Sequence, residues 1–195
     1  MATRLFNSKF SMFCEKIRVV LNMKKVPHDV VDVRADERKS LIAFSNQRKV
    51  PTMDFDGRCI QDSTILASYL EEKHPEPTIY PANPSDKGLC LMLEDWADED
   101  LNGAVMGFRR AKTEEDVNEA EKGLVVHLEN LDLLYSGREF VFGQMTLADI
   151  SIYAQLHYLY TSLDREIDSR YTNVHAFIER MMKATGVTSI KEVAA

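Results

Sequence analysis

The sequence predicts an α/β domain followed by an all-helical domain. Strand and helix signals alternate from residue 3 to residue 73, four prolines then crowd residues 74–84, and only helical patterns follow. A proline-rich segment is stiff and interrupts regular structure. We therefore expect residues 1–77 and 85–195 to form the two domains, with 78–84 as the linker.

The first domain is expected to run in the order β-α-β-α-β-β-α. Residues 4–6 form a short strand, apolar residues recur at helical spacing over 12–24, and β-branched residues make 26–33 the next strand. A helix through 41–44 follows. This order implies a mixed sheet, with its first half joined by crossover helices.

Residues 52–60 predict a hairpin that turns at Asp56-Gly57. Pro51, at its start, removes a donor from an interior ladder, and a cis bond there leaves Val50 to present its backbone to a ligand. Asp62-Ser63 opens the next helix, whose first N–H groups attract an anion. A peptide-like edge beside a carboxylate site suits a small peptide ligand.

Four helices are expected in the second domain. Their predicted starts are Ser85, Thr113, Thr146 and Val174. The first is expected to end near Leu101, because Gly103 and Gly107 follow and glycine disfavours a helix. The second carries leucines on one face and is expected to end at Gly137.

Composition excludes several classes of function. The chain has 195 residues, a hydrophobic fraction of 45% and a net charge of −7, without the basic stripe of a nucleic-acid protein. No signal peptide is evident and no apolar run approaches the ~20 residues of a membrane span. Cys14, Cys59 and Cys90 lack metal-ligand spacing, which indicates reduced thiols in the cytoplasm.

Three sets of residues could suggest a functional site, but we expect a structural or exposed role for each. The acidic run 94–100 has nearly consecutive carboxylates on a helix, which point in several directions, so a solvated face is expected there and no metal site. Cys59 and Cys90 are expected to pack in the interior. The five histidines lack a partner at catalytic spacing.

Ser11 is the candidate catalytic residue. It lies where the first strand turns into the first helix, and its hydroxyl can donate to an anion that the helix N-terminus also favours. Such a bond is worth about 1.5–3 kcal/mol, which lowers the pKa of a bound thiol by roughly one to two units. The structural alternative is that Ser11 only caps the helix.

Cys14 offers a redox alternative. It stands three residues after Ser11, where a C-x-x-C pair has its second cysteine, but the first cysteine is missing. Dithiol exchange within this motif is therefore excluded, and burial of Cys14 in the helix is expected.

Several short motifs together resemble the cytosolic glutathione S-transferase superfamily, in its serine-type form. The motifs are Leu5-Phe6, Ser11, Cys14-Glu15-Lys16-Ile17-Arg18, Lys49-Val50-Pro51-Thr52, Asp62-Ser63, Tyr69 through Pro75, Tyr80-Pro81, and Gly143 with Thr146-Leu147-Ala148-Asp149. Their order and spacing span residues 4–165. The resemblance implies a thioredoxin-like N-terminal domain and a C-terminal helical bundle. It also implies a homodimer, formed through the first domain of one subunit and the helix near residues 85–101 of the other.

The resemblance also implies a ligand set. Ser11 would face the glutathione sulfur, with Phe13 beside it, and Val50 would pair through its backbone with the cysteinyl part. Asp62 and Ser63 would hold the γ-glutamyl group. Lys49 would lie toward the glycine carboxylate, with Lys39 and Arg48 as alternatives. Glutathione would be the co-substrate, and no metal is implied.

Three functions compete on these residues. The preferred one is a glutathione transferase that activates the thiol for attack on, or isomerisation of, a small electrophile. The second is a non-catalytic regulator on the same fold, similar to stringent starvation protein A, and Ser11 favours the enzyme over it. The third is a thiol reductase that uses Cys14.

Overall fold

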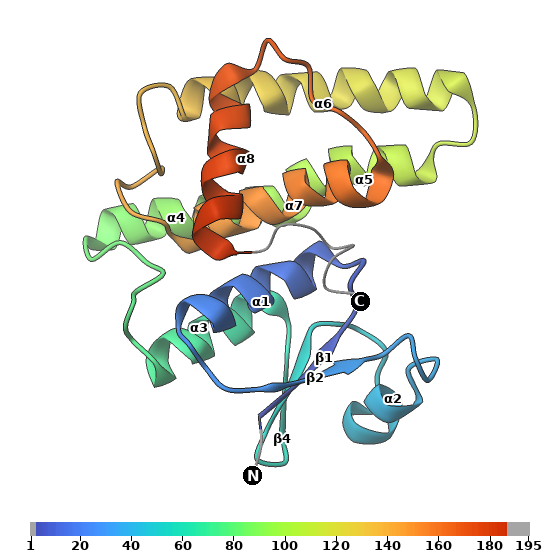
Figure 1. Cartoon of the computed structure of the whole chain (residues 1–195), viewed down its shortest axis with the longest axis vertical. Coiled ribbons are helices and arrows are strands. Elements are labelled where there is room, and N and C mark those ends of the chain that lie inside the picture. The colour runs from blue at the N-terminus through green and yellow to red at the C-terminus, as the bar shows by residue number, and fades with distance from the viewer. Residues whose placement is uncertain (1–2, 187–195) are drawn as a thin grey trace. The chain divides into compact units, whose positions relative to one another are not determined.

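The computed structural model describes residues 3–186. By its internal contacts the chain separates into two compact units, one that ends at Thr78 and one that begins at Ile79. The first is α/β and the second is all-helical, as the sequence predicts (Figure 1).

The first unit has the predicted element order. Its elements are β1 (Arg4–Asn7), α1 (Met12–Met23), β2 (Asp29–Asp32), α2 (Lys39–Ser45), β3 (Thr52–Phe55), β4 (Arg58–Gln61) and α3 (Ser63–Lys73). The strands form one mixed sheet in the order β2-β1-β3-β4, with β1 parallel to β2 and antiparallel to β3. β2 is shorter than predicted because β1 offers only four residues for pairing.

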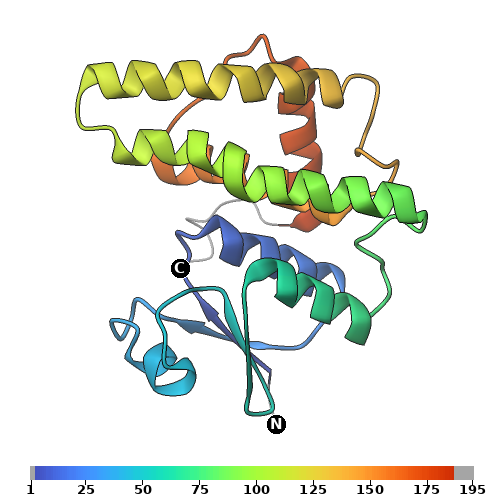
Figure 2. The ribbon, with the colours of Figure 1, turned by 180° about the vertical axis from the view of Figure 1, so that it is seen from behind.

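Helices cover both faces of this sheet. α1 and α3 contact each other on one face, and α2 lies on the other (Figures 1 and 2). Successive side chains of β1 point to opposite faces of the sheet, and Leu5 and Phe6 are both buried. Phe6 packs with Val33 and Leu41 and stacks on Phe44 of α2, with 5.3 Å between the ring centroids.

Up to residue 186, the second unit contains a long interrupted helix and three further helices. Its elements are α4 (Pro84–Trp96), the π-helical turn η1 (Ala97–Leu101), α5 (Asn102–Arg110), α6 (Glu114–Leu134), α7 (Leu147–Leu163) and α8 (Thr172–Thr185). α7 is buried from Leu147 to Leu159 and contacts α4, η1, α5 and α8. It is the central helix of this unit.

The first helix of this unit differs from its prediction at both ends. Asn83, not Ser85, caps it: the Asn83 side chain accepts hydrogen bonds from the N–H groups of Ser85 and Asp86 at 2.8 and 3.4 Å. The helical run then continues past Gly103 and Gly107 to Arg110 (Figure 2). A Cβ at Gly107 would lie 3.2 Å from Cβ of Ala120, so Gly107 allows α5 to approach α6 closely.

Candidate active site

The strand register brings the predicted site segments to one end of the sheet. Phe6 of β1 lies opposite Thr52 of β3, and Thr52 lies opposite Gln61 of β4. The β1–α1 turn with Ser11, the segment that enters β3 and the β4–α3 turn all adjoin this row. Residues separated by about fifty positions in the sequence therefore share one edge of the first unit.

Ser11 caps α1 and keeps a hydroxyl hydrogen for another partner. It has extended backbone angles (φ −122°, ψ 117°), and its Oγ accepts a hydrogen bond from the Cys14 N–H at 3.3 Å. A serine hydroxyl both accepts and donates. Capping and donation to a bound anion are therefore compatible, and the side chain is half-buried rather than sealed in.

Phe13 follows in the first turn of α1 and is half-buried. The N–H groups of this turn have no intrahelical acceptor, and one of them, from Cys14, is taken by Ser11. The Phe13 N–H belongs to the same row of donors at the helix N-terminus. This end of α1 consequently carries positive partial charge next to Ser11.

Cys14 is a buried thiol. Its Sγ accepts a hydrogen bond from the Ser8 N–H at 3.4 Å, and its side chain has no exposed surface. Burial raises the pKa of Cys14 above its ordinary value, against smaller lowering effects from Ser8, Ser11 and two arginines. Because the thiolate is the reactive form, this environment disfavours the reductase alternative.

Val50 precedes a cis peptide bond to Pro51, as the sequence predicts. The pairing of β3 with β1 begins only at Thr52. Within residues 3–186, neither the N–H nor the C=O of Val50 is hydrogen-bonded. Val50 therefore has both backbone groups available, while its half-buried side chain packs against the core formed by Phe6, Val33 and Leu41.

A residue that the sequence analysis missed holds this segment in place. The Gln47 amide donates to the Lys49 carbonyl at 3.0 Å and to Thr52 Oγ1 at 2.9 Å, and its Oε1 accepts from the Lys49 N–H. Thr52 Oγ1 in turn donates to the Lys49 carbonyl at 2.9 Å. Gln47 thereby positions the chain on both sides of Val50, and no sequence motif marks it.

Asp62 has an unusual backbone conformation at the start of α3. Its φ of 73° with ψ of 130° lies in a region that costs a non-glycine residue free energy. The Asp62 carboxylate accepts hydrogen bonds from the N–H groups of Thr64 and Ile65 at 2.9 and 3.2 Å through one oxygen, Oδ1. A strained residue that is also a helix cap is typical of a functional site.

Ser63 is the buried first residue of α3, and its N–H belongs to the first turn. Donors in a first helical turn favour an anion in front of them. Asp62 remains exposed beside it. The pair therefore offers an anion-binding helix start next to a carboxylate, which suits a ligand that carries both an ammonium and a carboxylate group.

The basic candidates lie on the α2–β3 side of the first unit. Lys49 and Arg48 are exposed, and Lys39 lies 3.7 Å from the exposed Glu37 carboxylate. Arg38 donates to the Arg48 carbonyl at 2.5 Å. The geometry leaves Lys49, Lys39 and Arg48 as alternatives for one carboxylate.

Two further expectations are corrected. Cys59 is exposed, not packed, because β4 is the edge strand of the sheet and its side chain lies on the surface; Cys90 is buried as predicted. The acidic run is not uniformly solvated either, since Glu94 is buried while Asp95, Glu99 and Asp100 are exposed.

Neither a metal centre nor a membrane span was found in the part of the chain that the structure describes. Over residues 3–186, no three or more His, Cys, Asp or Glu side chains cluster closely enough to hold a metal ion. No helix in that range is both long enough and apolar enough to cross a membrane.

Comparison with protein families gives matches over both units. Residues 5–78 match the family model "Glutathione S-transferase, N-terminal domain", and residues 99–189 match "Glutathione S-transferase, C-terminal domain". The Arabidopsis thaliana protein "Glutathione S-transferase DHAR2" is 30% identical over 158 residues, which cover 77% of this chain and 68% of that protein. A "Probable maleylacetoacetate isomerase" from Caenorhabditis elegans is 30% identical over 148 residues, which cover 70% and 69%.

Solved structures agree with this fold. The Tau class glutathione S-transferase from mango has a TM-score of 0.83 at 18% identity, with 99% of this chain and 97% of that chain covered. A glutathione S-transferase from Methylobacillus flagellatus, solved with glutathione bound, has a TM-score of 0.82 at 23% identity, with 96% and 99% covered. These matches confirm the predicted fold, a thioredoxin-like N-terminal domain followed by an all-helical C-terminal domain, as that of glutathione transferases.

Proposed function

The chain belongs to the glutathione S-transferase family, and from that membership we propose that Ser11 activates the thiol of bound glutathione for attack on a small electrophile. The observation that carries the proposal is the strand register, which gathers Ser11, Val50 and the Asp62-Ser63 pair at one end of the sheet. Each offers a different kind of polar group.

These groups match the parts of glutathione in order. The ammonium of the γ-glutamyl residue pairs with the exposed Asp62 carboxylate, and its carboxylate meets the Ser63 N–H at the helix start. The cysteinyl part forms backbone hydrogen bonds with Val50, whose N–H and C=O have no partner among residues 3–186. Phe13 lies in the turn beside the sulfur. Lys49 attracts the glycine carboxylate, with Lys39 and Arg48 as the alternatives.

Ser11 stabilises the thiolate. The Ser11 hydroxyl, whose hydrogen the cap does not use, donates a hydrogen bond to the sulfur, and the positive partial charge at the N-terminus of α1 also favours the thiolate. The bound thiol loses its proton to solvent, and the sulfur attacks the electrophile. In a substitution, the new carbon–sulfur bond replaces the bond to the leaving group, which departs with its electron pair. Alignment and charge stabilisation are the two catalytic contributions.

Calorimetric titration with reduced glutathione tests the site. We expect binding by the wild type, loss of affinity in Asp62→Asn and Ser63→Pro, and no change in Asp29→Asn, which alters an exposed aspartate of the edge strand β2. No heat from a folded wild type at millimolar glutathione would reject the proposal. Binding without turnover across several electrophiles would favour the non-catalytic regulator instead.

The second unit supports a proposal about assembly. Exposed apolar side chains lie on α4 and α6, among them Met92 (57% exposed) and Val126 (58%). A groove of about 300 Å³ lies between these helices, and its lining residues are Met92, Leu93, Trp96, Asn130, Leu131 and Leu134. We propose that the first domain of a second copy of the chain covers this exposed apolar surface of α4, because exposed apolar patches mark protein–protein interfaces and homodimer interfaces are more apolar than other interfaces.

The proposed location is the cytoplasm. Cys14, Cys59 and Cys90 are all free, and free thiols persist in a reducing compartment. One relative, from rice, is named a cytosolic enzyme.

A further inference from the structure

Phe10 lies next to Ser11 in the β1–α1 turn, and its ring lies close to two cations. The Arg34 guanidinium carbon lies 4.3 Å from the centroid of the Phe10 ring, and the Lys9 ammonium lies 5.5 Å from it. Both distances are within the range of a cation–π contact. The ring itself is 38% exposed. A cationic, aromatic surface therefore adjoins the residue that faces the glutathione sulfur.

The two cations are not neutralised by carboxylates. Within the described residues, neither the Lys9 ammonium nor the Arg34 guanidinium forms an ion pair, whereas Arg4 and Lys24 of the same unit do. The nearest acidic side chains along the chain, Asp32 and Asp36, accept hydrogen bonds from backbone N–H groups and form no ion pair with either cation. Asp32 Oδ1 accepts from the Arg34 N–H at 2.9 Å, and Asp36 Oδ2 accepts from the Ser40 N–H at 2.8 Å.

Other arginines extend the positive potential toward Ser11. Arg18 and Arg38 both act to lower the pKa of the Cys14 thiol, one turn beyond Ser11, although burial has the larger and opposite effect. The chain as a whole carries a net charge of −7. Because the charged ends of Lys9 and Arg34 form no ion pair within residues 3–186, each can attract an anion, and a separation within about 10 Å escapes most screening at 0.1 M salt.

We propose that Lys9, Phe10 and Arg34 select an electrophile that carries an anionic group, such as a carboxylate, on an unsaturated or aromatic frame. The anionic group pairs with Lys9 or Arg34, the flat frame lies against Phe10, and the electrophilic carbon is thereby held near Ser11. The inference rests on the proposed function of Ser11 and adds the chemical class of the second substrate.

A matched pair of electrophiles tests the inference. The carboxylate 4-chloro-3,5-dinitrobenzoate and its neutral amide, 4-chloro-3,5-dinitrobenzamide, undergo the same substitution, in which sulfur bonds to carbon 4 and chloride leaves. The readout is the ratio of their kcat/KM values, measured for the wild type, Lys9→Gln and Arg34→Gln. Glutathione affinity is measured by calorimetry on the same samples.

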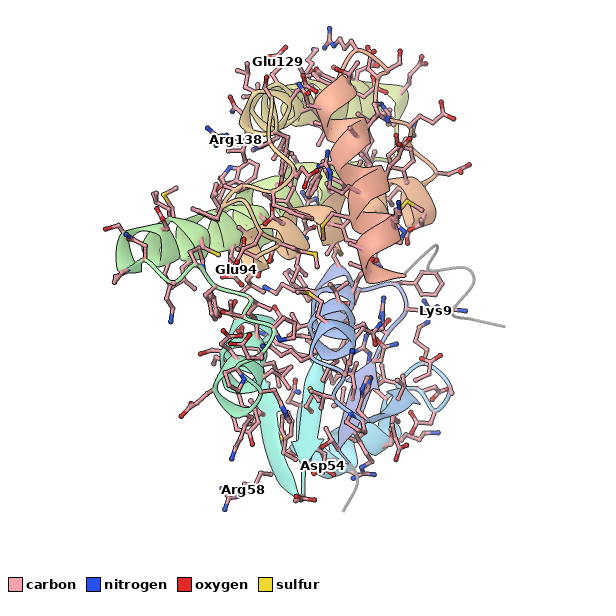
Figure 3. The ribbon with its side chains drawn as sticks, turned by 60° about the vertical axis from the view of Figure 1, so that its left-hand side comes forward. Lys9, Asp54, Arg58, Glu94, Glu129 and Arg138 are labelled. Atoms are coloured by element: carbon pink, nitrogen blue, oxygen red, sulfur yellow. The ribbon has the colours of Figure 1, made fainter. Side chains whose placement is uncertain are left out.

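Arg58→Gln is the control variant. Arg58 is an exposed arginine of the same unit, but it lies at the hairpin end of β4, where it pairs with Phe55 at the other end of the sheet from Thr52. Figure 3 labels Lys9 and Arg58 at separate places on the unit. Arg58→Gln therefore removes one positive charge, as Lys9→Gln and Arg34→Gln do, but leaves the surface beside Ser11 unchanged.

The expected result is a preference for the carboxylate in the wild type that falls about two- to fivefold in each of the two variants, the scale of a single exposed ion pair. Added salt should reduce the same preference, and Arg58→Gln should retain it. The inference is overturned if the ratio is unchanged in Lys9→Gln and Arg34→Gln. It is also overturned if both electrophiles lose rate equally while glutathione affinity falls, because the cations would then bind glutathione.

Failure of the proposed function has a different signature. A folded wild type that binds no glutathione and turns over neither electrophile rejects the role of Ser11, and the inference falls with it. Glutathione binding with turnover of both electrophiles, but without the charge preference, rejects the inference alone.

Discussion

The Lys24 ammonium lies 2.6 Å from the Glu71 carboxylate, and the Lys24 side chain is fully buried. Lys24 caps the end of α1, and Glu71 is in the last turn of α3. The same ammonium donates to the carbonyl oxygens of His74 and Pro77 at 2.6 and 2.9 Å. One buried cation thus fastens the two helices on one face of the sheet to the segment that leaves the first unit.

Lys24→Met should destabilise the first unit strongly. Removal of one member of a buried ion pair leaves the other charge uncompensated, at a cost of about 3–5 kcal/mol, and two carbonyl groups also lose their donor. Urea unfolding followed by circular dichroism measures the loss. The exposed neighbour Lys25→Met is the control, with no comparable change expected. Equal stability of the two variants would contradict the role given to Lys24.

Asparagine substitutions at two aspartates in equivalent helix caps, Asp149 and Asp116, should differ in how much stability they remove. Asp149 of α7 is buried: its Oδ1 accepts from the Tyr135 hydroxyl and the Val141 N–H, and its Oδ2 accepts from the Thr146 N–H and hydroxyl, all between 2.8 and 3.2 Å. Asp149→Asn replaces one acceptor by a donor, so about 2–3 kcal/mol of stability should be lost. Asp116→Asn, in the exposed cap of α6, should lose less.

The pH dependence of these two aspartates should have opposite signs. Burial raises the pKa of Asp149, so the folded state holds its proton more tightly and stability falls as pH rises from the ordinary aspartate pKa through the raised one. Hydrogen bonds from Lys112 and Thr113 lower the pKa of Asp116, so its contribution is lost as pH falls through the lowered value. Unfolding of each asparagine variant and the wild type from pH 3 to pH 7 measures both slopes. If the two aspartates changed the slope of stability against pH in the same direction, the opposite pKa shifts given to them would be contradicted.

Ser11→Ala should leave glutathione affinity nearly intact and lower turnover about ten- to hundredfold at neutral pH. The loss follows from a charge-assisted hydrogen bond of ~1.5–3 kcal/mol, which the alanine variant cannot donate to the thiolate. The deficit should shrink at higher pH, where the thiol ionises unaided. A pH–rate profile with a neutral aryl halide measures it.

Cys14→Ala is the matched control for Ser11. Because the Cys14 thiol is buried and its pKa is raised by burial, its removal should have little effect on rate. A rate loss confined to Cys14→Ala would restore the reductase alternative, and a Ser11→Ala profile that superimposes on the wild type would reject Ser11 as the activating group.

Met92→Glu should shift the protein from dimer to monomer. The substitution places a charge in the apolar groove between α4 and α6, and a charge buried without a partner opposes association. Light scattering measures the mass against the 22.3 kDa of one chain. Leu91→Glu, on α4 but outside the groove, is the control. A wild type with the mass of one chain at micromolar concentration would contradict the proposed homodimer.

Most of the fold was accessible from local sequence patterns. The capping signals at Thr113 and Thr146, and the Asp56-Gly57 turn, act within a few residues and predicted the correct element starts. The length of β2 was not accessible, because it depends on how many residues β1 presents. The prediction that Gly107 lies beyond the end of the helix was wrong for a similar reason. Gly107 allows the close approach of Ala120 from another helix, which local sequence does not reveal.

In the candidate site too, some residues could be predicted from the sequence and others could not. Ser11, Val50, Asp62 and Ser63 stand in short motifs, so the sequence alone marked them. Gln47 acts through hydrogen bonds that exist only once its loop has folded, and Arg34 meets Phe10 across more than twenty residues of chain. Side chains of this kind have no local signature.

The π-helical turn at Ala97–Leu101 sets the rotational phase of α5. An α-helix advances about 100° per residue, and a π turn accommodates one residue more than an α turn. Deletion of one residue there would restore a continuous α-helix and rotate α5 by that angle about its axis. Asn102 would turn away from Gln155, to which it donates at 3.0 Å, and Arg109 away from Tyr158. The pairing of α5 with α7 thus depends on one inserted residue, and insertions and deletions in this turn are a route by which related chains can present a different side of the same helix.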